Sequence, residues 1–79
     1  MSRTPKTKLV PLSLEELGAR LKQHREALGM SVVDAAESIE ISHERLAAIE
    51  IGEASITSLE IHRLSKLYLT TLSVLLLRK

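Results

Sequence analysis

Three histidines are the side chains best suited to metal binding or proton transfer, but their spacing suits neither. His24, His43 and His62 lie nineteen residues apart, and no pair has the His-x-x-x-His spacing that places two ligands on one helix face. The chain has no cysteine, so it lacks thiolate ligands, thiolate nucleophiles and disulfides. Its serines have no base in a recognisable arrangement, and three scattered glycines form no phosphate-binding loop. We therefore expect no enzyme, no metal and no cofactor.

The other side chains with binding chemistry are charged, and they are segregated along the chain. Residues 1–28 carry six basic and three acidic side chains, residues 29–60 carry one and seven, and residues 61–79 carry four and none. The chain thus has an acidic centre between basic ends, which favours contact with a charged partner, although such runs are as often only solvated helix faces. A single aromatic residue, Tyr68, argues against base stacking with single-stranded nucleic acid.

Length and hydropathy limit the chain to one small domain. Its 79 residues are near the lower limit at which a hydrophobic core alone stabilises a fold. The longest apolar runs, such as Val74 to Leu77, have four residues and cannot cross a bilayer. The basic N-terminus is not followed by the apolar segment of a signal peptide. We expect a soluble cytoplasmic protein with no membrane contact.

Residues 1–12 differ from the rest of the chain in composition. They contain both prolines and the basic residues Arg3, Lys6 and Lys8, and they show no helical period. We expect them to form a flexible basic arm before a domain of residues 13–79.

Capping signals and apolar spacing predict five helices and no strand in residues 13–79. We expect helices over about 14–28, 32–39, 43–51, 58–68 and 72–79, capped by Ser13, Ser31, Ser42, Thr57 and Thr71. We expect Gly29 to end the first helix and Gly52 to occupy the left-handed position that ends the third. The residues expected to face inward are Leu14, Leu17, Leu21, Leu28, Leu46, Ile49, Ile61, Leu64, Leu67, Tyr68, Leu72, Leu75 and Leu76.

A helix followed by two short helices at a tight turn, with two more helices covering them, is the layout of a helix-turn-helix domain. The segments LGARLKQHREALGMSVVDAAESIEISHERLAAIEIGE and SLEIHRLSKLYLTTLSVLL resemble the Cro/C1 repressor family, also called the XRE type. The match covers about residues 14–76. It implies an all-α, five-helix, lambda repressor-like DNA-binding domain with the helix-turn-helix in the second and third helices.

The resemblance also implies roles for particular residues. Arg25 and Glu50 match a family pair that joins the first and third helices, so we expect a structural ion pair. The positions matching DNA contacts are Ser42, His43, Glu44, Arg45 and Ala48 in the third helix, Val32 at the start of the second, and, by their charge, Arg3, Lys6 and Lys8 in the arm. Chemistry allows Glu44 to accept from cytosine, Arg45 to pair with guanine and His43 to donate.

The departures from the family fall on this expected contact surface. Val32 replaces a glutamine, Ile51 replaces a polar residue, and Glu53 stands where basic residues often follow the glycine. With few phosphate contacts, DNA affinity should be modest. Two hypotheses stay open. In the first, the chain is a regulator that binds double-stranded operator DNA with its third helix, as a homodimer whose interface is the C-terminal helix. In the second, it is a degenerate, antitoxin-like or scaffold domain that binds a protein partner through the acidic face of its second and third helices.

Overall fold

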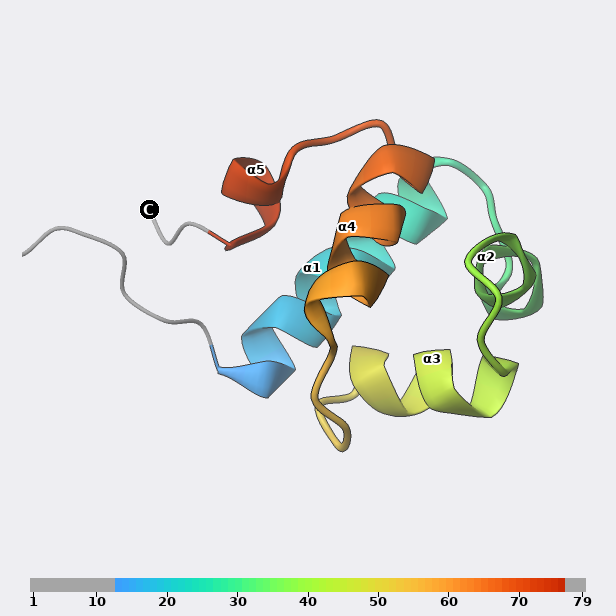
Figure 1. Ribbon diagram of the computed structural model, residues 1–79, viewed down its shortest axis with the longest axis horizontal. Coiled ribbons are helices and arrows are strands. Elements are labelled where there is room, and N and C mark those ends of the chain that lie inside the picture. Colours follow the sequence, from blue (N-terminus) through green and yellow to red (C-terminus); the bar gives the residue numbers. More distant parts are fainter. Residues whose placement is uncertain (1–12, 77–79) are drawn as a thin grey trace, which may run out of the picture.

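The computed structural model describes residues 13–76, which form five helices and, within that range, no strand (Figure 1). The helices are α1 (Leu14–Ala27), α2 (Val32–Ser38), α3 (His43–Glu50), α4 (Ser58–Leu67) and α5 (Leu72–Leu76). The predicted all-α, five-helix fold is therefore confirmed. The first four helices end one residue earlier than predicted, because that last residue is the C-cap in each case. The predicted arm, residues 1–12, and residues 77–79 lie outside the described residues.

Each helix begins at the hydroxyl residue that the sequence predicts. The hydroxyls of Ser13, Ser31, Ser42, Thr57 and Thr71 each accept a hydrogen bond from the amide three residues on, at 3.0–3.2 Å. At α1 and α4 the third helical residue is a glutamate, whose carboxylate accepts from the cap amide at 3.0 and 2.9 Å. Both ends of these capping boxes are therefore formed, which satisfies amides that have no partner within the helix.

The first four helices also end in the same way, with a left-handed residue directly after the C-cap. Gly52 has φ of +84°, as predicted, and Gly29, which was expected to end α1, has φ of +71°. Glu40 and Leu69 adopt φ of +66° and +58° without being glycine. In all four, the next amide donates to the carbonyl five residues back, at 2.9–3.2 Å, which completes a Schellman motif. A non-glycine residue in this conformation costs about 1–2 kcal/mol, and the tertiary structure has to compensate for it.

The core is aliphatic and lies where the five helices meet. Leu21, Leu46, Leu64 and Leu75 are fully buried. The inward stripe predicted for α1 is too long, because Leu14 and Leu28 at its two ends are exposed. The same correction applies to Leu72 and Leu76 in α5, where Leu75 is the single buried residue.

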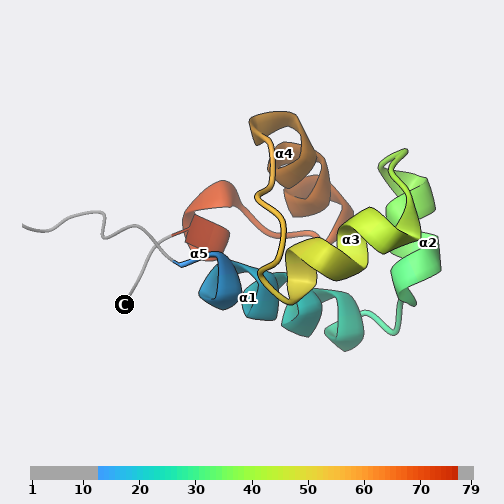
Figure 2. The same ribbon diagram turned by 90° about the horizontal axis from the view of Figure 1, so that it is seen from below.

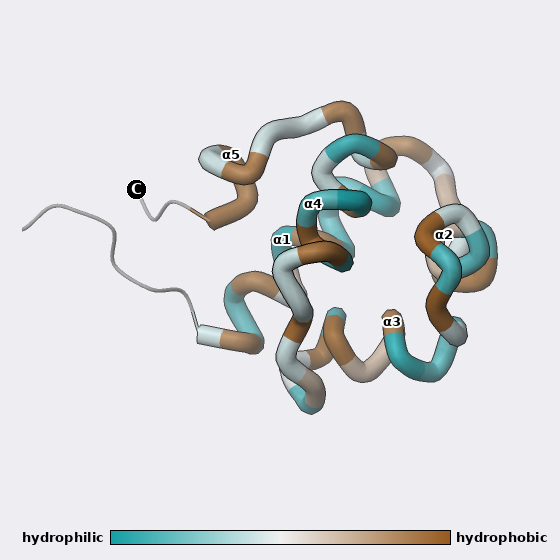
Figure 3. Tube along the Cα trace, in the orientation of Figure 1, coloured by the Kyte–Doolittle hydropathy of each residue, from teal (hydrophilic) through white to brown (hydrophobic). Residues whose placement is uncertain are grey.

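The helices are arranged so that α3 forms one edge of the molecule. It packs on α1 and α2, and α5 packs on α1 and α4 (Figure 2). The hydrophobic residues of α5 therefore lie at the opposite end of the molecule from α2 (Figure 3). Both α2 and α3 are short, and the tight turn between them makes them cross steeply, as in a helix-turn-helix.

Gly18, in the middle of α1, allows the close approach of α3. A β carbon built at Gly18 would overlap the carbonyl oxygens of Ile49 and Glu50. An isolated glycine inside a helical pattern is a signal of close packing, and Gly18 is a residue that we did not predict to have this role. The end of α3 thus rests directly on the α1 backbone.

Candidate nucleic-acid interface

The outer surface of α3 is polar at its N-terminal end and apolar further along. His43 and Glu44 are exposed, with 3.6 Å between His43 Nε2 and Glu44 Oε2. Ala47 is exposed and Ala48 is half-buried. The hydroxyl of Ser42 accepts from the Arg45 amide and so acts as the helix cap. Of the contact residues predicted within α3, His43 and Glu44 are therefore the two with exposed side chains.

Arg25 and Glu50 lie in direct contact between α1 and α3. Arg25 Nε donates to Glu50 Oε2 at 2.7 Å, and Arg25 Nη2 donates to Glu50 Oε1 at 3.0 Å. Arg25 Nη1 also donates to the carbonyl of Met30 at 2.8 Å. Both side chains are buried, and the hydrogen bond to Glu50 raises the pKa of Arg25. Removing one member would leave a buried charge without its partner, at about 3–5 kcal/mol.

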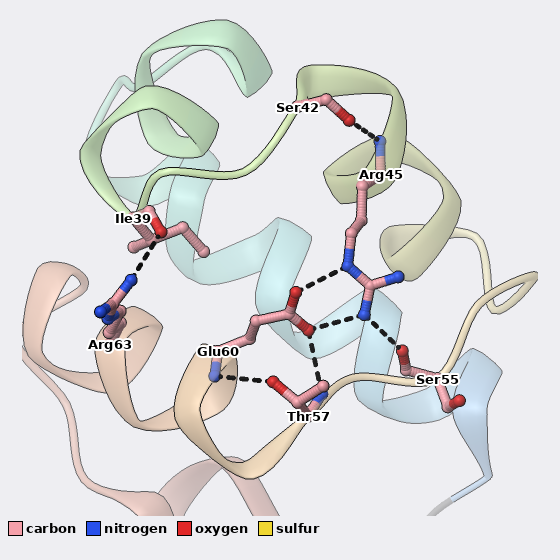
Figure 4. A network of polar contacts seen from close by, with 7 residues as sticks. All are labelled: Ile39, Ser42, Arg45, Ser55, Thr57, Glu60 and Arg63. Carbon is pink, nitrogen blue, oxygen red and sulfur yellow. Dashed lines mark hydrogen bonds and ion pairs between the residues drawn. The ribbon is translucent and has the colours of Figure 1, made fainter.

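Arg45 is turned toward α4 (Figure 4). Its Nε donates to Glu60 Oε2 at 2.6 Å, and its Nη2 donates to Glu60 Oε1 at 2.8 Å and to the Ser55 carbonyl at 3.1 Å. The Arg45 side chain is 36% exposed and that of Glu60 is 13% exposed. The hydrogen bond from Arg45, reinforced by the Thr57 amide, lowers the pKa of Glu60 to about 2. The residue expected to pair with guanine thus forms a bidentate ion pair within the protein.

Nothing in the sequence pattern indicates this pair. Glu60 is already explained as the capping-box glutamate of α4, and Arg45 precedes it by fifteen residues. Helical periodicity relates residues three or four apart, so it does not connect side chains on two different helices. Only the tertiary structure, which places the start of α4 within reach of Arg45, brings the two charges together.

The surface of α2, α3 and the following turn is acidic. Its exposed carboxylates belong to Asp34, Glu37, Glu40, Glu44 and Glu53. Arg45 is the single lysine or arginine of residues 29–60, and Glu60 balances its charge. Val32, matched to a DNA-contacting glutamine, is half-buried and packs against the core, while Ile51 is 60% exposed.

The described arginines all tie parts of the fold together. Besides Arg25 and Arg45, Arg20 donates to the carbonyls of Val74 and Leu75 at 3.0 and 3.2 Å. Arg63 donates to the carbonyl of Ile39, the C-cap of α2, at 3.1 Å. The predicted contacts Arg3, Lys6 and Lys8 lie outside the described residues. Within residues 13–76, all of the arginines therefore donate hydrogen bonds to other groups of the chain.

A family model for the helix-turn-helix domain matches residues 16–75, which covers all five helices except the ends of α1 and α5. The chain belongs to the helix-turn-helix domain family. No curated protein matches it. The predicted resemblance to repressor-type DNA-binding regulators is confirmed at the level of family and fold.

Solved structures of regulators share this fold. The clp gene regulator ClgR from Corynebacterium glutamicum is 26% identical, with a TM-score of 0.79 over 84% of this chain and 70% of that one. The restriction-modification controller protein C.AhdI from Aeromonas hydrophila is 22% identical, with a TM-score of 0.75 over 78% and 94% of the two chains. A hypothetical transcription factor from Neisseria, 18% identical, has a TM-score of 0.76 over 94% and 87%. The last two show likeness of fold alone.

Residues 13–76 contain neither a membrane-spanning helix nor a cluster of metal ligands. No helix among them is long and apolar enough to cross a membrane. Within the same range, histidine, aspartate and glutamate side chains form no group of three or more that could hold a metal ion.

Proposed function

We propose that this protein is a transcription regulator that binds operator DNA as a homodimer, with α3 in the major groove and with modest affinity. The proposal rests on the orientation of α3 as the second helix of a helix-turn-helix, with one side buried and the other exposed. Leu46, Ile49 and Glu50 fix its inner side, and His43 and Glu44 stand exposed at its N-terminal end. In domains of this layout, that end of the second short helix contacts base edges.

The proposed contacts follow from the chemistry of each side chain. Glu44 accepts from the amino group of cytosine, His43 donates to a base acceptor, and the methyl group of Ala48 contacts thymine. Ser42 and Val32 flank these residues at the starts of α3 and α2. Arg3, Lys6 and Lys8 supply phosphate or minor-groove contacts. We propose that the protein acts in the cytoplasm.

The modest affinity follows from the charge of the surface. Exposed carboxylates of α2 and α3 repel phosphates, and phosphate neutralisation supplies most non-specific affinity. The arm and the second subunit then have to provide most of the positive charge. Binding of this type weakens steeply as salt rises.

A salt series tests the proposal. Binding of the full chain to a pool of random-sequence duplex DNA should be measurable at about 50 mM salt and fall by more than tenfold by about 200 mM. Lys6→Gln should lower the slope of log affinity against log salt by about 1, because one phosphate contact is lost. Lys66→Gln, the same charge change on an exposed residue of α4, is the control. A wild-type chain with no DNA binding at the lowest salt would refute the proposal.

We propose that a homodimer forms through the α5 end of the molecule. Leu72, Val74 and Leu76 on α5 are exposed, and Leu69, just before it, is 83% exposed. We propose that the exposed apolar residues of α5 form the interface that a second copy covers. A dimer would also double the few DNA contacts that one chain makes.

The acidic surface favours a second candidate function. The exposed carboxylates of Asp34, Glu37 and Glu53 and the exposed side chains of Val33 and Ile51 belong to α2, α3 and the following turn, where Arg45 is already paired. A surface that combines carboxylates with apolar side chains suits a basic protein partner, as in an antitoxin or a scaffold. A chain that bound no DNA at any salt would favour this function over the first.

A further inference from the structure

The two ends of α3 are held by ion pairs to two different helices. Glu50, its last residue, pairs with Arg25 on α1, and Arg45, in its first turn, pairs with Glu60 on α4. We infer that Arg45 is a positioning residue, which sets the orientation of α3 through Glu60 and does not itself read bases. The inference rests on the proposed DNA-binding function and adds to it a residue that controls how α3 meets the groove.

Three of the five N–H donors of Arg45 are in use. A guanidinium has five N–H hydrogens: one on Nε and two on each Nη. The Nε hydrogen goes to Glu60, and the two hydrogens on Nη2 go to Glu60 and to the Ser55 carbonyl. Bidentate recognition of guanine needs parallel donors from two nitrogens. Because Nε and Nη2 already donate within the protein, only the hydrogens on Nη1 remain. Arg45 therefore lacks two free nitrogens with parallel donors for guanine.

The partner of Arg45 is fixed independently of it. Glu60 Oε1 accepts from the amide of Thr57 at 2.9 Å, and the Glu60 amide donates to the Thr57 hydroxyl at 3.1 Å. This capping box holds the carboxylate at the start of α4 whether or not Arg45 is present. Arg45 therefore docks onto a carboxylate already in place, and moving it to DNA would break three hydrogen bonds.

The position of Arg45 along α3 determines what the pair controls. The C-terminal end of α3 is held by Arg25 and by its close contact with Gly18. The N-terminal end also packs on α2, and the Arg45 pair is what joins it to α4. Without that pair, the N-terminal end is free to tilt relative to α4 about the fixed end. His43 and Glu44 lie at the N-terminal end, so a small tilt would displace both from the bases together.

Two variants with opposite charge changes separate this role from base reading. Arg45→Gln removes a positive charge, and Glu60→Gln removes a negative charge while keeping an amide oxygen to accept from Thr57. Simple attraction to phosphates predicts opposite effects on DNA affinity. If Arg45 positions α3, both variants should lower affinity for the sequence that wild type selects from a random duplex pool, each by about tenfold. Base preferences should stay unchanged, and Lys66→Gln, the control, should alter affinity less than about twofold.

A different result would overturn the inference. A base preference lost at one position in Arg45→Gln but kept in Glu60→Gln would make Arg45 a base-reading residue. Affinity that rises in Glu60→Gln would also contradict the positioning role. Both results leave the proposed DNA-binding function intact.

A measurement without DNA keeps the two questions distinct. Residual dipolar couplings of backbone amides report the orientation of α3 relative to α1 and α4. In Arg45→Gln and Glu60→Gln, the couplings of α3 should change while those of α1 and α4 stay as in wild type, which also shows that the variants fold. Unchanged α3 couplings in both variants would refute the inference. If wild type bound no DNA, the proposed function would fail, and these couplings would still decide whether the pair orients α3.

Discussion

At the scale of single residues, Glu60 illustrates how one carboxylate can stabilise two elements. It completes the capping box of α4 with Thr57 and also pairs with Arg45 of α3. Hydrogen bonds to the ionised form lower its pKa to about 2, from an ordinary value of about 4.3. The charged form is therefore the one that the folded state prefers.

The lowered pKa predicts an acid-sensitive contribution to stability. A carboxylate whose pKa is lower in the folded state stabilises the fold fully above its unfolded pKa, and this stabilisation is lost as pH falls from about 5 toward 2. Urea unfolding at pH 7, 4 and 3 should show wild type more stable than Glu60→Gln at pH 7, with the difference shrinking at acid pH. A difference that stayed constant with pH would show that the pair adds no pH-dependent stability.

At the scale of helices, Gly18 decides how closely α1 and α3 pack. Alanine favours helix over glycine by about 1 kcal/mol, so Gly18→Ala would stabilise an isolated α1. In the folded chain the added methyl group would overlap the Ile49 and Glu50 carbonyl oxygens. We expect a net loss of about 1–3 kcal/mol in the free energy of unfolding, measured by urea denaturation. Lys22→Ala, at an exposed site on the same helix, should be nearly neutral, and a stabilised Gly18→Ala would show that α3 can shift away.

The elements predicted from the sequence are those with local signals. The caps Ser13, Ser31, Ser42, Thr57 and Thr71 were all predicted correctly, because capping joins a side chain to an amide three residues away. Glu40 and Leu69 gave no sign of their left-handed conformation, since neither is glycine. The contacts of Arg45 with Glu60 and of Arg20 with Val74 depend on how helices cross, which periodicity does not specify. The fold was thus more predictable than the surface.

At the scale of the whole molecule, charge inside the fold differs from charge available to partners. The four arginines in residues 13–76 all bond to carbonyl or carboxylate groups of the chain: Arg20, Arg25, Arg45 and Arg63. Exposed carboxylates cover α2 and α3, and exposed leucines lie at the α5 end. The two ends of the molecule therefore suit different kinds of contact.

The dimer proposal is tested at the α5 end. Val74→Lys places a charge in the proposed apolar interface and should weaken dimerisation by at least about tenfold. Leu59→Lys makes the same kind of change on α4, at a residue that is also exposed, and serves as the control. Sedimentation equilibrium over a range of concentrations measures both. A wild-type chain with a monomer mass at every concentration would contradict the proposed homodimer.

On α3, the residues that maintain the fold are separate from the exposed residues that the proposed function uses. Leu46, Ile49 and Glu50 face the protein, while His43, Glu44 and Ala47 are exposed. Substitutions at the exposed positions leave the core and the Arg25 ion pair untouched. A lineage carrying this domain can therefore change its target, or exchange one class of partner for another, through a few surface substitutions without passing through an unfolded intermediate.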